Sequence, residues 1–112
     1  MDHEDRPEAP DSSLGGYFDV HDRPPAFEGS DGQPYTVSIE VEKAADPRNP
    51  FIGYLVFPRW ADTGLGVVGH VETPILFMGA TRTGVSEQAG ALPLEEVKRL
   101  LDEAIQHQDR RE

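Results

Sequence analysis

The fold is decided by the segment Tyr35-Thr36-Val37-Ser38-Ile39-Glu40-Val41-Glu42, in which apolar and polar side chains alternate without a break. A period of two is typical of an antiparallel strand with one face against a core and the other in water. The turn signal Asp31-Gly32 comes shortly before it. We therefore predict a strand over residues 35–42 whose odd-numbered side chains point into the core.

Further strands are predicted downstream of this segment. Residues 51–57 are apolar on both faces, which is typical of a central strand, and residues 67–72 predict a shorter strand rich in β-branched side chains. Thr73-Pro74 then interrupts pairing, because proline has no N–H to donate. Residues 75–80 predict one more short strand, so the expected number is three to four.

The last apolar pattern has the spacing of a helix that begins after Pro93. Its apolar positions are Leu94, Val97, Leu100, Leu101, Ala104 and Ile105. The predicted fold class is thus α+β, with an antiparallel β-meander of three to four strands and one C-terminal amphipathic helix packed on one face. In this two-layer sandwich the strand 35–42 and the helix 94–105 share one dry core.

The remaining segments set the expected domain organisation. Residues 1–16 are acidic and rich in Pro, Ser and Gly, which predicts a disordered arm. Residues 17–107 form the predicted single α+β domain, and residues 108–112 a frayed C-terminus. Within the domain, residues 17–21 are expected to be at best an edge strand, and residues 81–91 to hold no more than one helical turn.

Composition restricts the classes of function. The 112 residues include no cysteine, which excludes disulfides, thiolate zinc sites and a cysteine nucleophile. The net charge is −11 at pH 7, with nine acids and two arginines in residues 1–32 and twelve acids and eight bases in residues 33–112. No broad basic surface is available, so duplex nucleic acid is not an expected partner. No signal-peptide pattern or spanning apolar run occurs, and we expect a cytoplasmic protein with no membrane contact.

His70 and Glu72 are the strongest polar pair, because they lie two residues apart on a predicted strand and share one face. They suggest a metal or acid/base site. A third ligand would come from His21, Asp62 or His107, and the alternative is a solvated strand face. We predict no metal site, no cofactor and no catalytic residue.

Two further candidates for binding lie outside that pair. Arg59 and Trp60 form the type of pair that anchors protein interfaces. The simpler interpretation is that Trp60 fills the space under the terminal helix together with Tyr54 and Phe57. Arg82 lies between glycines in residues 79–84, a pattern similar to anion-cradling loops. Because the Lys-Ser/Thr of a P-loop is absent, a glycine-rich connection from strand to helix is favoured.

The order of these elements also resembles a known family. YTVSIEVE, GYLVFPRW and the final amphipathic helix are similar to the β-β-β-α order of HicB-type antitoxins. The resemblance is one of topology, since the family's Gly-Cys turn and DNA-binding tail are absent and residues 75–80 add a strand. It implies a regulatory protein with an obligate protein partner.

The leading functional hypothesis is a small non-enzymatic protein-interaction module. Self-association is an option within it, because an edge strand at residues 67–72 or 75–80 could pair with its twin. One alternative is a small-molecule or metal-dependent enzyme with a site between sheet and helix, around His70, Glu72 and Arg82. The other is an antitoxin-like regulatory protein.

Overall fold

A computed structural model of the chain describes residues 9–111, and side chains are described for residues 9–108. This part of the chain forms six strands and three helices. In chain order they are α1 (Leu14–His21), β1 (Ala26–Glu28), β2 (Pro34–Thr36), β3 (Ser38–Lys43), β4 (Phe51–Trp60), β5 (Val67–Glu72), β6 (Phe77–Gly79), α2 (Arg82–Gly90) and α3 (Leu94–Arg111).

All six strands belong to one antiparallel sheet, organised around the long strand β4. On one side β4 pairs with β3, from Ser38↔Val56 to Lys43↔Phe51, and with β2 at Tyr35↔Arg59, while β1 extends the sheet beyond β2. On its other side β4 pairs with β5 and β6. The prediction that residues 51–57 form a central strand is confirmed.

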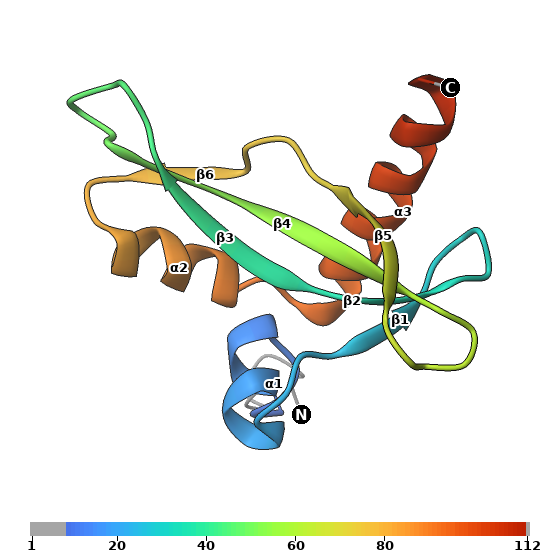
Figure 1. Ribbon diagram of the computed structural model, residues 1–112. Coiled ribbons are helices and arrows are strands. Elements are labelled where there is room, and N and C mark those ends of the chain that lie inside the picture. The colour runs from blue at the N-terminus through green and yellow to red at the C-terminus, as the bar shows by residue number, and fades with distance from the viewer. Residues whose placement is uncertain (1–8, 112) are drawn as a thin grey trace, which may run out of the picture.

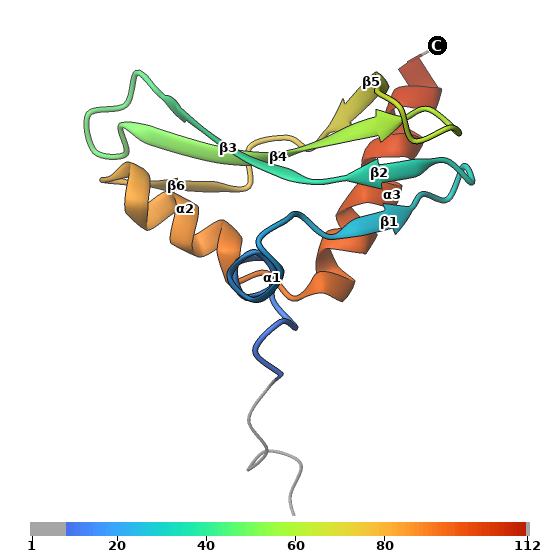
Figure 2. The same cartoon turned by 60° about the horizontal axis from the view of Figure 1, so that its bottom comes forward.

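The three helices lie on the same face of the sheet (Figure 1). Turned by 60°, the sheet spans the top, α1 and α2 lie beneath it, and α3 begins beneath it and rises past β5 at one end (Figure 2). The α+β class and the C-terminal helix on one face are therefore as predicted. The finer prediction of three to four strands with one helix is wrong, because the described chain has six strands and three helices.

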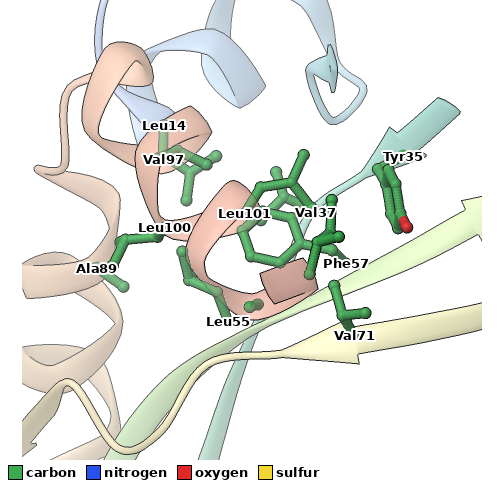
Figure 3. Close-up of a cluster of buried hydrophobic side chains, with 12 residues drawn as sticks. Leu14, Tyr35, Val37, Leu55, Phe57, Val71, Ala89, Val97, Leu100 and Leu101 are labelled. Atoms are coloured by element: carbon green, nitrogen blue, oxygen red, sulfur yellow. The ribbon is translucent and has the colours of Figure 1, made fainter. Parts of the chain in front are cut away.

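The core lies between the sheet and α3, as the alternation in residues 35–42 and the stripe on the last helix predicted (Figure 3). Tyr35 and Val37 are buried from the sheet side, and Val97 and Leu101 from α3. The full cluster is Leu14, Tyr35, Val37, Leu55, Phe57, Val71, Ala89, Val97, Leu100, Leu101, Ala104 and Ile105. The predicted single strand 35–42 is divided into β2 and β3 at Val37, but its odd-numbered side chains keep the expected side.

The prediction of an edge strand at residues 17–21 is wrong, since these residues lie in α1. Ser13 caps this helix by accepting the N–H of Gly16 (3.1 Å), and the buried Leu14 anchors it. Its first residues are fastened to the α2–α3 junction, where the Leu14 N–H donates to the Leu92 carbonyl at 2.8 Å. The first eight residues of the predicted arm lie outside the described residues. Leu14, which belongs to the same predicted arm, is buried in the core cluster.

α2 is longer than the single turn expected for residues 81–91. Thr81 is its N-cap and accepts the N–H of Gly84 at 2.9 Å. Val85 and Ala89, four positions apart, are completely buried. The weak helical propensity of the glycines is therefore offset by burial against the sheet.

The interruption at Thr73-Pro74 occurs as predicted, and a side chain compensates for it. The Thr73 N–H donates to the Leu55 carbonyl (3.0 Å), while the Leu55 N–H donates to Oγ1 of Thr73 (3.1 Å) in place of a backbone carbonyl. Thr73 is 5% exposed. A buried hydroxyl thus satisfies the donor that the proline kink would leave unpaired. Over the described residues, no helix is both long and apolar enough to cross a membrane.

Candidate functional site

The sheet face turned away from the helices carries a row of large side chains along β4. Gly53, Leu55 and Phe57 are buried on the helix side. Because side chains alternate along a strand, the residues between them point to the opposite side. The row consists of Ile52, Tyr54, Val56, Pro58 and Trp60, all of them half-buried. We call the surface formed by this row and its polar neighbours the open face, since no described helix covers it (Figure 2).

Carboxylates border the row on both sides. On β3, Glu42 accepts a hydrogen bond from the Tyr54 hydroxyl (2.6 Å), and Glu40 accepts one from Ser38 Oγ (2.6 Å). On β5, Glu72 lies 3.4 Å from His70 Nε2. The open face therefore combines an apolar centre with a negatively charged border.

The negative charge of this border affects the pKa of Tyr54. Its pKa is raised to about 12, mainly because the phenol donates to the Glu42 carboxylate, with smaller contributions from partial burial and from the charges of Glu42, Glu72 and Glu40. All these carboxylates disfavour a phenolate anion. The face thus disfavours negative charge, and a positively charged group would be stabilised there.

Replacing Glu42 by glutamine is expected to lower the pKa of Tyr54 from about 12 towards its ordinary value of 10.0. The folded-state pKa is raised, so the stabilisation from this bond is complete below pH 10 and is lost as the pH rises towards 12. Absorbance titration of tyrosinate measures the shift, and Tyr54→Phe assigns the transition. Glu40→Gln is the matched control and should move the transition less, because Glu40 bonds Ser38; an equal shift would contradict the assignment.

A second feature is a groove between β5 and the C-terminal half of α3, with a volume of about 890 Å³. One wall is the strand segment from His70 to Pro74 and the other is α3 from Leu100 onward. Val71, Leu100 and Ala104 are buried at its base. Glu103, Gln106, His107 and Gln108 complete the lining.

Arg59 and Trp60, predicted as one anchoring pair, lie on opposite faces of the sheet. Trp60 donates its Nε1–H to Oγ1 of Thr36 (2.9 Å) at the end of the open face. Arg59 lines a hollow of about 330 Å³ on the helix side, beside Asp31 and Ile105. The interpretation of Tyr54, Phe57 and Trp60 as filling under the terminal helix is therefore correct for Phe57 and wrong for the other two.

His70 and Glu72 do share one strand face, and both line the groove. Arg82 is not among the groove-lining residues. It begins α2, where its guanidinium donates to the Val41 carbonyl (3.2 Å) and lies 5.0 Å from the centre of the Phe51 ring. The three residues of the predicted enzyme site are thus divided between two places.

Of the three predicted sources of a further ligand, only His107 lines the same groove as His70 and Glu72. His21 bonds Asp11 on the α1 side of the molecule (2.9 Å), and Asp62 is an exposed residue of the β4–β5 loop. Within residues 9–108, no three His, Asp or Glu side chains are grouped so that they could hold a metal ion.

In the comparisons with known proteins, no family model, no curated protein and no solved structure matches the chain.

Proposed function

We propose that this chain is a protein-interaction module that docks a basic protein partner on its open face. The carrying observation is the row from Ile52 to Trp60, five half-buried side chains on the central strand that no helix within residues 9–111 covers. A sheet usually buries an apolar face against another layer. A contiguous apolar patch with a polar rim is typical of a protein-binding surface.

The side chains of this row suit docking. Tyr54 and Trp60 are of the residue types enriched in binding hot spots, and both are held by hydrogen bonds, to Glu42 and Thr36 respectively. A side chain that is already fixed loses little conformational entropy on binding. Both aromatics belong to the same rigid strand, so the surface exists before the partner arrives.

The charge of the face selects the kind of partner. Glu40, Glu42 and Glu72 surround the apolar row, so a second copy of this face would bring like charges together. A surface with lysines or arginines around an apolar centre would be complementary. An antitoxin-like regulator would present an acidic, apolar-centred face like this one to a small basic protein. An enzyme built on His70, Glu72 and Arg82 has less support, because Arg82 lies away from the other two residues.

Replacing Val56 by lysine is expected to weaken partner binding about tenfold or more, because it places a positive charge in the centre of the apolar row and repels a basic partner. Affinity purification from the cells of origin, with wild-type and V56K chains as baits, identifies the partner by mass spectrometry. Calorimetric titration of the purified pair then gives the affinities.

The matched control is Ser86→Lys, which adds the same charge at an exposed position of α2. Its affinity should stay within about twofold of the wild type. Equal binding of the wild type, V56K and S86K chains would contradict docking on the open face. Co-purification of a stoichiometric small basic protein would favour the antitoxin-like alternative within this proposal.

A further inference from the structure

The groove lies along the free edge of β5. The pairing of β5 with β4 shows which backbone N–H and C=O groups of β5 point towards this edge. Thr73 donates its N–H to the carbonyl of Leu55 on β4. In an antiparallel ladder, residues that face the partner strand alternate with residues that face away. From Thr73, the residues facing β4 are Val71 and Gly69, consistent with their register opposite Phe57 and Arg59. The N–H and C=O groups of His70 and Glu72 therefore point away from β4, towards the groove.

No other described strand uses this edge, because within residues 9–111 β5 pairs with β4 alone. Exposed edges of this kind readily accept another strand, and proteins commonly block them with prolines or covering segments. Here α3 lies beside the edge of β5, and the groove separates the helix from this edge. Pro74 ends the row of donors at one end.

We propose that the groove between β5 and α3 binds an extended basic peptide as an additional strand on β5. Its backbone would bond the N–H and C=O groups of His70 and Glu72. Its alternate side chains would enter the groove and contact Leu100 and Ala104. This site lies beyond the surface of the proposed function, since it uses the backbone edge of β5, and it shares with the open face only the polar side chains of His70 and Glu72.

The spacing of the backbone groups selects an extended ligand. Two residues along a strand are separated by about 7 Å, a repeat that matches a strand and not the tighter rise of a helix. Strand addition of this type obtains affinity from main-chain hydrogen bonds and specificity from pockets for alternate side chains. The apolar base provides such a pocket through the buried Leu100 and Ala104.

The lining selects positive charge. Glu72 and Glu103 contribute two carboxylates, and among the side chains of residues 9–108 no lysine or arginine lines the groove. Glu103 also bonds Arg99 on α3, so the Glu72 carboxylate provides the larger share of the attraction. A peptide that alternates apolar residues with lysine or arginine fits both the base and the rim.

The proposal is tested by selecting a displayed library of random octapeptides on the full chain and comparing two variants of one residue. His70→Pro removes the N–H that points into the groove and leaves the ladder with β4 intact, since that N–H is not part of it. His70→Ala removes the side chain and keeps the N–H. Enriched peptides should be basic and alternating, bind H70P about tenfold or more weakly, and bind H70A within about threefold of the wild type.

Binding should also slow amide hydrogen exchange at His70 and Glu72. If H70P does not fold, a selected peptide with N-methylated alternate amides replaces it. Methylation of the register that faces β5 should weaken binding about tenfold, and methylation of the other register should not. Ile52→Lys places a charge in the same apolar row but opposite Met78 and not opposite Glu72, so it keeps the groove and should bind these peptides normally. Failure here is therefore distinguishable from failure of the open-face proposal.

Several results would overturn the proposal. They are the absence of any enriched peptide, peptides that bind H70P and H70A equally, and insensitivity to both N-methylated registers. A homodimer in sedimentation velocity that H70P dissociates would assign the edge to a second copy of this chain instead.

Discussion

Replacing Phe57 by alanine is expected to lower the free energy of unfolding by about 3–5 kcal/mol, the usual cost of truncating a buried phenylalanine. Phe57 is completely buried and is the largest such side chain in the molecule as described. It projects from the central strand into the cluster shared with α3 (Figure 3). Removing its ring leaves a cavity between the two layers, which strand and helix can fill only in part.

The matched control is Tyr54→Ala, three residues earlier on the same strand but on the open face. Tyr54 is half-buried and loses one exposed hydrogen bond, so the expected cost is about 1 kcal/mol. Chemical denaturation followed by circular dichroism and by fluorescence of the single tryptophan measures both variants. Comparable losses in the two variants would mean that both faces of β4 are equally buried, which would remove the basis of the proposed docking surface.

The loss expected for Phe57→Ala is a large part of the total free energy of unfolding. Small domains are stable by about 5–15 kcal/mol. Phe57→Ala would therefore remove at least about a fifth of the total free energy of unfolding. Tyr54→Ala, in contrast, leaves a folded protein for binding experiments. One face of this strand thus contributes to stability, and the other is the proposed docking surface.

The sequence predicted the elements whose periodicity is strong. The alternation in residues 35–42 and the stripe from Leu94 to Ile105 gave the core side of the sheet and the helix that covers it, because each pattern allows only one buried face. The apolar segment 51–57 was correctly predicted as central. Its second apolar face lies on the side of the sheet that no described helix covers.

The helix α1 was missed and α2 was expected to be no longer than one turn, because the stability of both helices does not reside in their own residues. Gly15 and Gly90 allow the two helices to approach so closely that a Cβ at Gly15 would lie 3.2 Å from the Gly90 Cα. Low helix propensity argued against both segments, and tertiary packing reversed it. The usable signals were the caps, Ser13 and Thr81, each three residues before a glycine whose N–H it accepts.

The residues of the candidate site were predicted in part, but through their side chains and not through their backbone groups. His70 and Glu72 were chosen for their side chains, whereas the structure also directs their backbone groups into a groove. That direction depends on the phase of the β4–β5 ladder, which the sequence does not contain. The border of the open face likewise depends on register, because Glu42 reaches Tyr54 only when β3 pairs with β4 as observed.

Replacing Gly53 by alanine is expected to destabilise the protein by about 1–3 kcal/mol, the usual cost of overpacking a core. A Cβ at Gly53 would lie 2.5 Å from Cγ1 of Val85. Val85 is completely buried and β-branched, so it cannot rotate away without strain. The glycine on the central strand is therefore what allows α2 to pack against the sheet, and its replacement pushes the helix outward.

The double variant Gly53→Ala/Val85→Ala isolates this contact. Each single change destabilises, but the second removes the methyl group that the first collides with, so the double variant should be more stable than the sum predicts by about 0.5–3 kcal/mol. Gly79→Ala is the control, because its Cβ would lie 3.3 Å from Cγ2 of the same valine and requires only a small adjustment. Urea denaturation of the set gives the coupling energy. Strict additivity would show that the close approach of α2 to Gly53 is wrong, and with it the reason why a glycine-rich segment folds as a helix beneath the sheet.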